Sequence, residues 1–146
     1  MSDVPLFGER LPGCDYVRRP SVYALLRDKR GNWAVVRTLF GCYLPGGGAA
    51  PGETRRQTVE REGLEECGFV LKVGRVLGSA VQFVYSTEER QYFEKVCTFV
   101  DAEVVETVLP TEPNHELLWV NLEDALKLLT HESHCWALQN LAGELV

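Results

Sequence analysis

The chain has 146 residues, of which 45% are hydrophobic and 25% charged, and its formal net charge is −6 at pH 7. These values are ordinary for a globular protein, and the length suits a single domain over residues 1–146. The negative charge argues against binding to a long nucleic acid, and no apolar run approaches the ~20 residues that span a bilayer.

The N-terminus and the cysteines predict a cytoplasmic protein. The first residues, MSDVPLFGERLPG, lack the basic and apolar regions of a signal peptide. The five cysteines are widely spread and form no CxxC pair, so neither a disulfide framework nor a zinc site is indicated. Cys67 and Cys97 lie within apolar patterns, and we expect both to be buried.

The first third of the chain is predicted to be irregular at its start and then to form a hairpin. Prolines and a glycine interrupt residues 1–19, so no regular element is expected there. The apolar runs 21–27 and 33–39 flank a polar turn at 28–32 and predict two paired strands. Residues 40–48 are predicted to form a glycine-rich loop.

A helix is predicted over Thr54–Cys67. Glu53 and Thr54 suit the exposed N–H groups at its start, and Gly68 suits a left-handed residue just past its end. The other elements follow in chain order: strands at 70–86 and 91–105, polar loops at 87–90 and 106–116, a strand at 117–120, a helix from Asn121 (capped with Asp124) to 129, and a helix at 133–141. The order β-β-α-β-β-β-α predicts a mixed α/β fold.

Three glutamates gather on one side of the predicted helix. Because a helix advances 100° per residue, Glu62, Glu65 and Glu66 fall within a 100° arc. The other side carries apolar residues at core-facing spacings: Val59, Leu64 and Cys67. On these residues alone the acidic side is more easily interpreted as a solvated surface, with Arg61 and Glu65 as a weak i,i+4 pair.

The glycine-rich loop favours a metal site over a solvated surface. Gly46, Gly47 and Gly48 allow the backbone to approach a ligand closely, and clustered carboxylates are oxygen ligands that Mg²⁺ accepts together with substrate phosphates. A divalent cation would also relieve the repulsion that raises the pKa values of neighbouring glutamates. Gly63, in the middle of the helix, is expected to let the helix lie close to this loop.

These residues resemble the signature of the Nudix hydrolase family, G-x5-E-x7-R-E-U-x-E-E-x-G-U, where U is a bulky apolar residue. Gly47 is followed after five residues by Glu53, and seven more lead to the run 61–69, REGLEECGF. Every fixed position matches, so the signature covers residues 47–69. Gly63 is a departure, at a position that binds no ligand. The resemblance implies an α/β/α sandwich with a mixed β-sheet.

The resemblance also implies a metal-dependent activity. Members of the family typically hydrolyse a diphosphate linkage in a nucleoside diphosphate joined to another group, with Mg²⁺ or alternatively Mn²⁺ as the cofactor. By position, Glu62 and Glu66 would be the principal metal ligands. Glu65 would be a further ligand or the catalytic base, and the backbone carbonyl of Gly46 an additional ligand. Some relatives are homodimers, which makes a dimer possible.

Other residues would have supporting or alternative roles. Glu53 would support the metal cluster or its water shell, and Arg61 would orient a helix carboxylate. Family members take the base either from the helix or from a later loop, and in this chain Glu112 is the candidate in the loop, with a solvated loop carboxylate as the alternative interpretation. His115 suits either a phosphate contact or a turn. The two remaining histidines, His131 and His134, are expected at the surface rather than among the metal ligands.

The substrate is predicted to be a small nucleotide. The compact length is typical of MutT-like members that act on nucleoside triphosphates, and this is the leading hypothesis. Dinucleoside polyphosphates, ADP-ribose and nucleotide sugars are alternatives. ADP-ribose enzymes often carry a proline where Val84 stands, whereas dinucleoside polyphosphate enzymes often carry a tyrosine near Tyr85, which here is expected to pack on a sheet. A non-catalytic nucleotide sensor is the alternative of another class.

Overall fold

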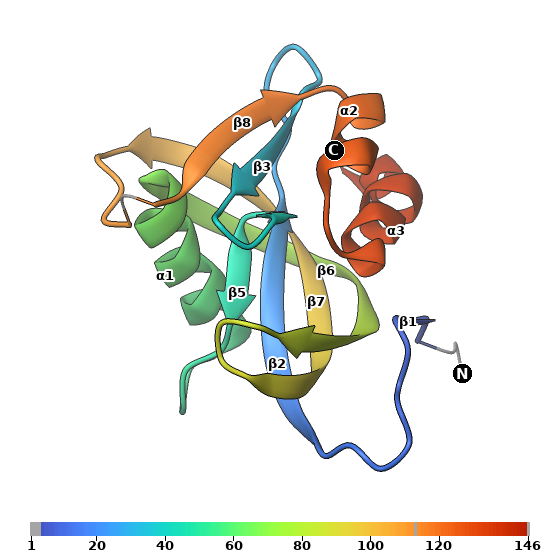
Figure 1. The fold of residues 1–146 in the computed structure, drawn as a ribbon. Coiled ribbons are helices and arrows are strands. Elements are labelled where there is room, and N and C mark those ends of the chain that lie inside the picture. The colour runs from blue at the N-terminus through green and yellow to red at the C-terminus, as the bar shows by residue number, and fades with distance from the viewer. Residues whose placement is uncertain (1–3, 113, 146) are drawn as a thin grey trace.

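The larger of two sheets forms the centre of the molecule (Figure 1). The structure, a computed structural model, describes residues 4–112 and 114–145. The sheet is mixed: β1 with β6 and β2 with β7 are parallel, whereas β6 with β7 and β2 with β5 are antiparallel. Its five strands lie in the order β1 (Leu6–Phe7), β6 (Phe69–Ser86), β7 (Gln91–Thr107), β2 (Tyr16–Leu25) and β5 (Gly46–Gly48).

A second, smaller sheet contains β4 (Cys42–Tyr43), β3 (Trp33–Arg37) and β8 (Glu116–Val120), in this order and antiparallel. The predicted hairpin is present only around its turn at residues 28–32, because β2 and β3 belong to different sheets. Next to this turn, Arg27 and Trp33 form an antiparallel bridge and the N–H of Ala34 donates to the carbonyl of Leu26, and beyond it the two strands pair with other strands. The strand that pairs along β3 is β8, about 80 residues later in the sequence, which no local pattern reveals.

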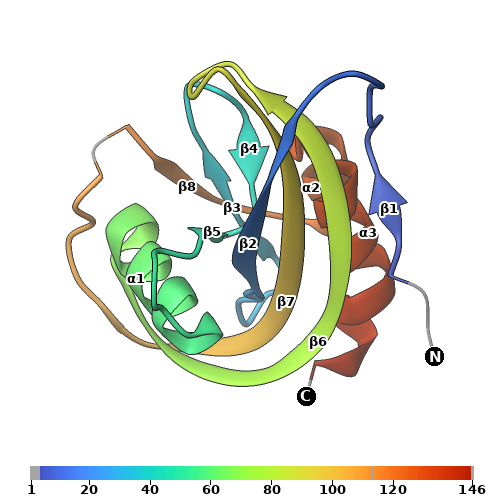
Figure 2. The ribbon, with the colours of Figure 1, turned by 90° about the horizontal axis from the view of Figure 1, so that it is seen from below.

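Helices cover both faces of the five-stranded sheet. Figure 2 shows α1 (Arg55–Cys67) inside the curve of β6 and β7, with α2 (Leu122–Leu128) and α3 (Glu132–Leu141) on the outer side. Alternate residues of β2 point to opposite faces. Thus Val22 packs in the core cluster that contains Val59 of α1, and Tyr23 packs in the cluster that contains Leu138 of α3. The predicted α/β/α sandwich is confirmed. A short 3₁₀ turn, Ala142–Glu144, follows α3.

The helix α1 begins and ends as predicted. The hydroxyl of Thr54 accepts the N–H of Gln57, whose side chain in turn accepts the N–H of Thr54. Gly68 has a φ of 69° and donates its N–H to the carbonyl of Leu64. Asn121 likewise accepts the N–H of Asp124 at the start of α2. Local capping chemistry therefore fixes these ends.

Two expectations about the packing of α1 are wrong. Val59 and Cys67 are buried, but Leu64 is 39% exposed and contributes little to the core. Gly63 does not make room for the glycine-rich loop. A Cβ atom on Gly63 would lie 2.7 Å from Cδ1 of Leu71, so this glycine lets the helix approach β6.

Short strands occupy segments that were expected to be irregular. Within residues 4–19, β1 is present and β2 begins at Tyr16, because Tyr16 to Arg19 pair in parallel with Tyr92 to Lys95 of β7. The stretch 40–48 likewise contains β4 and β5. Both cases depend on partners distant in sequence. Among the described residues, no helix is both long and apolar enough to cross a membrane.

Candidate active site

The site is built where the acidic side of α1 meets β5, an edge strand composed of glycines. A Cβ atom on Gly47 would lie 2.7 Å from the carboxyl carbon of Glu62, so the absence of a side chain makes room for this carboxylate. The N–H of Gly46 donates to Oε1 of Glu66 over 3.0 Å. The glycine strand therefore lies close to both glutamates. Gly47 leaves space for the carboxylate of Glu62, and the backbone N–H of Gly46 binds the carboxylate of Glu66.

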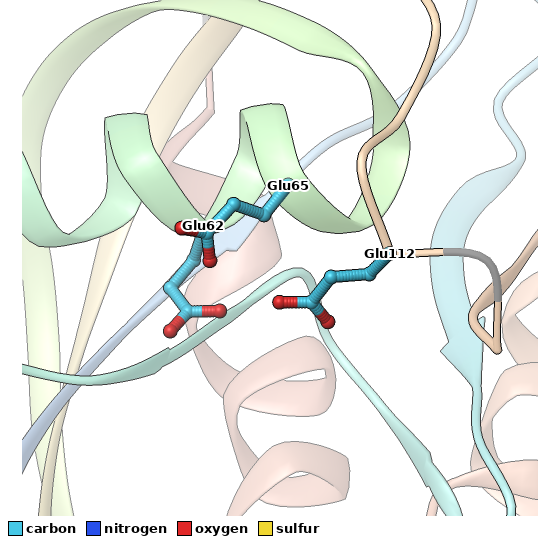
Figure 3. Close-up of side chains that lie close together, drawn as sticks. All are labelled: Glu62, Glu65 and Glu112. Atoms are coloured by element: carbon cyan, nitrogen blue, oxygen red, sulfur yellow. The ribbon is translucent and has the colours of Figure 1, made fainter.

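Three carboxylates converge beside this strand. One oxygen from each of Glu62, Glu65 and Glu112 lies within 4.8 Å of the others, and Figure 3 shows Glu62 and Glu65 on the helix and Glu112 on the loop opposite. The N–H groups of Thr111 and Glu112 both donate to the carbonyl of Glu65, which fastens this loop to the end of α1. The predicted helix glutamates and the loop candidate Glu112 therefore belong to one site.

Arg61 holds the helix carboxylates in place from the side. Its guanidinium donates to both carboxylate oxygens of Glu53, at 2.6 and 3.0 Å, and to Glu62 and Glu65 at 2.9 and 3.2 Å. A further N–H of Arg61 donates to the carbonyl of Gly48. Arg61 therefore contacts both helix carboxylates, and its orienting role stays a prediction. Glu53 contacts Arg61, the N–H of Ala50 and the hydroxyl of Thr58, and so reaches the carboxylate cluster through the arginine.

The carboxylates of the site have displaced pKa values. Burial raises the pKa of Glu62 to about 7 and raises the pKa of Glu66 well above its ordinary range. Partial burial also raises the pKa of Glu112. By contrast, the hydrogen bonds from Arg61 lower the pKa of Glu53 to about 2. A bound cation would favour the ionised form of such crowded, partly buried carboxylates. The donor set, all oxygen, fits Mg²⁺.

His115 lies between two of these carboxylates. Its Nδ1 atom is 2.7 Å from Oε2 of Glu112, and its Nε2 atom is 4.0 Å from Oε2 of Glu66. His115 is therefore placed inside the site rather than in an isolated turn. This position suits either the orientation of Glu112 or a contact with a bound phosphate.

A cleft of about 630 Å³ extends from the carboxylates. Glu62, Glu66, Glu112 and His115 line one end. Most of its other lining residues come from three segments: the loop between β3 and β4, the outer part of the β6–β7 hairpin, and the residues just before α3. This volume falls within the usual range for small-molecule sites. A second cavity of about 560 Å³ is lined by Arg27, Trp33 and Leu122, among others, and shares no residue with the carboxylate site.

The expectation that His131 and His134 lie at the surface is wrong. They are 6% and 0% exposed, because α3 packs directly on the sheet. The Nδ1 atom of His134 accepts the N–H of Leu44, and His131 lines the cleft. Tyr85 packs on its cross-strand partner Tyr92, with 4.7 Å between ring centroids, which confirms its expected packing role although it also borders the cleft.

Sequence reasoning did not single out several residues of the cleft. Lys95 comes from the first part of β7, Tyr43 from β4, and Phe40 and Thr130 from the connections that precede β4 and α3. Lys95 interrupts an apolar strand pattern, and this was the only local signal. Its meaning depends on the neighbours that the fold brings to it.

An α/β/α sandwich with an acidic helix beside a glycine-rich strand defines a hydrolase of the Nudix type. The model of the NUDIX domain family matches residues 17–137, and the chain therefore belongs to this family. The predicted enzyme class, a hydrolase acting on phosphorus-containing acid anhydrides, is confirmed.

Solved structures are similar in fold. A MutT protein from Methanosarcina mazei Go1 is 24% identical, with a TM-score of 0.68 and coverage of 89% of this chain and 96% of that one. A NUDIX hydrolase from Nitrosomonas europaea is 12% identical, with a TM-score of 0.67 and coverage of 88% and 90%. An ADP-ribose pyrophosphatase from Streptococcus suis 89-1591 is 16% identical, with a TM-score of 0.55 and coverage of 73% and 75%. A search of curated proteins found no match.

Proposed function

We propose that the protein is a Mg²⁺-dependent pyrophosphohydrolase whose substrate is a nucleoside or deoxynucleoside triphosphate, as in MutT-like enzymes. The observation that carries the proposal is the convergence of Glu62, Glu65 and Glu112 within 4.8 Å at one end of a cleft of about 630 Å³. A diphosphate group placed there would meet the carboxylates, and the rest of the nucleotide would occupy the cleft. We place the reaction in the cytoplasm, where the five free thiols would stay reduced.

The carboxylates divide into ligands and a base. Glu62 and Glu66 would be the principal ligands of Mg²⁺, with Glu65 and the carbonyl of Gly46 as further ligands, and Mn²⁺ is an alternative ion. The metal, when bound, neutralises phosphate charge and lowers the pKa of water. Glu112 would take the proton of the attacking water. Its backbone bond to Glu65 and the neighbouring His115 hold it opposite the helix.

Arg61 and Glu53 would act as positioning residues. The guanidinium group contacts three of the glutamates and would hold Glu62 and Glu65 in one orientation while a substrate binds. Glu53 in turn fixes the guanidinium through two hydrogen bonds. This arrangement supplies a pre-formed site, which lowers the cost of bringing charged groups together during the reaction.

A nucleotide panel tests the proposal. Pyrophosphate and phosphate release would be measured with Mg²⁺, and with a chelator as the control, on nucleoside triphosphates, oxidised triphosphates, dinucleoside polyphosphates, ADP-ribose and nucleotide sugars. We expect turnover to be fastest on a triphosphate, with pyrophosphate as a product. Faster turnover of another class would replace the substrate and keep the chemistry. Tight binding without any turnover would instead support the nucleotide sensor.

A matched pair of variants connects this activity to the helix. Glu66→Gln keeps the size of a buried side chain and removes its charge, whereas Glu60→Gln makes the same change at an exposed position of α1. We expect Glu66→Gln to lower turnover by more than about 100-fold, beyond the usual effect of residues that only support a metal site, and to leave the fold intact. Equal activity of the two variants would contradict the proposed metal site.

A further inference from the structure

The part of the cleft that is lined by Phe40, Tyr43, Lys95 and His131, named here the base end, contains a lysine that forms no ion pair among the described residues. Lys95 lines the cleft from the first part of β7, where Gln82 of β6 and Arg19 of β2 are its neighbours in the sheet. Among the described residues, no carboxylate oxygen lies within 4.0 Å of its ammonium group. Burial lowers the pKa of Lys95. A partly buried lysine is costly unless a bound group accepts its hydrogen bonds.

His131 lies at the same end of the cleft and is also incompletely bonded. It is 6% exposed, and its Nε2 atom is buried without a hydrogen-bond partner among the residues that the structure describes. Burial lowers the pKa of His131 to about 4, so the ring is neutral at pH 7 and carries one N–H donor and one acceptor. Water or a bound molecule therefore has to form the missing hydrogen bond with Nε2 of His131.

Aromatic side chains form the wall next to these two residues. Phe40 is 50% exposed and lines the cleft from the loop between β3 and β4. Tyr43, from β4, lies with its ring centroid 5.0 Å from that of His131. An exposed phenylalanine beside a tyrosine suits the face of a flat, aromatic group.

The aromatic wall is fixed to the segment that carries His131. The N–H of Cys42 donates to Oγ1 of Thr130, and the N–H of Thr130 donates to the carbonyl of Cys42, both over 2.9 Å. In addition, a Cβ atom on Gly41 would lie 2.4 Å from Oγ1 of Thr130, so the loop approaches as closely as a glycine allows. The aromatic wall and the segment that carries His131 are therefore held together as one unit before any substrate binds.

We propose that this end of the cleft binds the nucleobase of the substrate, and that Lys95 makes it select bases with a carbonyl oxygen over bases with an amino group at the same ring position. The inference rests on the proposed function only in taking the substrate to be a nucleotide. Lys95 is a specificity-determining residue in this assignment, with Phe40 and Tyr43 against the face of the base and His131 at its edge. An ammonium group only donates hydrogen bonds, so it pairs with a carbonyl oxygen and opposes an amino group.

Two pairs of nucleotides exchange a carbonyl oxygen for an amino group, and with it the hydrogen on the adjacent ring nitrogen. Inosine triphosphate has a carbonyl oxygen where adenosine triphosphate has an amino group, and uridine triphosphate differs from cytidine triphosphate in the same way. We expect kcat/KM of the protein to favour the carbonyl member of at least one pair by about tenfold or more, the usual size of discrimination by a well-placed donor. An equal kcat/KM within both pairs would overturn the proposal.

Variants at Lys95 separate base selection from a general effect. Lys95→Met keeps much of the side-chain length and removes the donor, and we expect the preferred carbonyl nucleotide to lose about tenfold in kcat/KM while its amino counterpart changes little. Lys95→Arg keeps a donor-only cation and should keep the preference, even if Lys95→Met folds poorly. Lys127→Met, at an exposed position of α2, is the matched control. Uniform loss on all four nucleotides would show a phosphate contact and overturn the proposal.

Failure of the proposed function can be told apart from failure of this inference. If the wild-type protein hydrolyses neither these four nucleotides nor any other nucleotide of the panel, the proposed function is wrong. The inference is then tested by calorimetric binding of inosine and adenosine monophosphates to the wild type and to Lys95→Met. Preferential binding of the inosine nucleotide that is lost in the variant supports the assignment, and equal binding of both nucleotides overturns it.

Discussion

The carboxylate of Glu62 occupies the space beside Gly47 in which a side chain would stand, 2.7 Å from the position of a Cβ atom. This relationship joins the two halves of the signature, the glycine strand β5 and the acidic helix α1. The strand lies at the edge of the sheet, and its lack of side chains lets the helix glutamates approach the cleft. The glycine is therefore required by the position of the carboxylate rather than by an unusual backbone angle.

Gly47→Ala should displace Glu62 and lower Mg²⁺-dependent turnover by about 10–100-fold, the effect of disturbing the support of a metal ligand. The matched variant is Gly48→Ala, whose new Cβ atom would meet the flexible side chain of Arg19, with Cδ nearest at 3.0 Å. Turnover and Mg²⁺ affinity measured side by side check the expectation. Similar losses in both variants would mean that β5 tolerates no side chain at all, independently of Glu62.

Arg61→Met should destabilise the metal-free protein by about 1–2 kcal/mol, because Glu53, Glu62 and Glu65 would lose their shared cation while the site stays partly solvated. Mg²⁺ should recover part of this loss by binding the same carboxylates. Urea unfolding with and without Mg²⁺ measures both effects. Arg56→Met, at an exposed position of α1, is the control and should change stability by less than about 0.5 kcal/mol.

The metal-free protein should become less stable as the pH rises from about 5 to 8. The pKa of Glu62 is about 7 in the folded protein, above the ~4.3 of an unfolded glutamate, so the folded state binds more protons in this interval. The stabilisation present below the unfolded pKa is lost as the pH passes through the folded value. Glu53, with a pKa of about 2, acts only at lower pH and in the opposite direction.

Unfolding at pH 5 and pH 8 in the presence of a chelator measures this loss, which we expect to be on the order of 1–3 kcal/mol. Mg²⁺ should reduce the loss, since it binds the ionised carboxylates and competes with protons. A Glu62→Gln variant should show a smaller dependence on pH. A metal-free protein that grows more stable between pH 5 and 8 would contradict the assigned direction.

Glu112→Gln distinguishes a base from a ligand. If Glu112 takes the proton of water, kcat should fall by about 10²–10⁴-fold with little change in KM or in the affinity for Mg²⁺. Glu106→Gln, an exposed change near the end of β7, provides the comparison. A loss of Mg²⁺ affinity with a modest change in kcat would make Glu112 a metal ligand, which its place in the carboxylate cluster also permits.

Local sequence predicted those parts of the fold that local chemistry determines. The limits of α1 followed from Thr54 and Gly68, and its acidic side followed from the angular spacing of Glu62, Glu65 and Glu66. The family signature predicted the sandwich and the class of enzyme. Glu112 was a candidate through the family resemblance alone, with a solvated carboxylate as the alternative, and its approach to the helix depends on the backbone bonds to Glu65 that the fold creates.

The features that local sequence patterns did not predict depend on contacts between segments that are distant in the sequence. The early part of β2 exists because it pairs with β7, and β3 turned away from β2 to pair with β8. His131 seemed exposed because a histidine near a predicted helix start usually is, yet α3 lies against the sheet. The role of Lys95 could not be predicted from its own segment, because the other residues of the cleft around it come from residues 38–43 and 130–131.

The two reciprocal bonds between Cys42 and Thr130 have an evolutionary consequence. They fix the wall of the cleft to the C-terminal helices, whereas Glu112 is fixed separately, by its bond to the end of α1. Substitutions of the exposed Leu39 and Phe40 would therefore change the wall of the cleft without disturbing the position of Glu112, whereas Gly41 leaves no room for a side chain. A lineage built in this way can diversify at one end of the cleft while the other end is conserved.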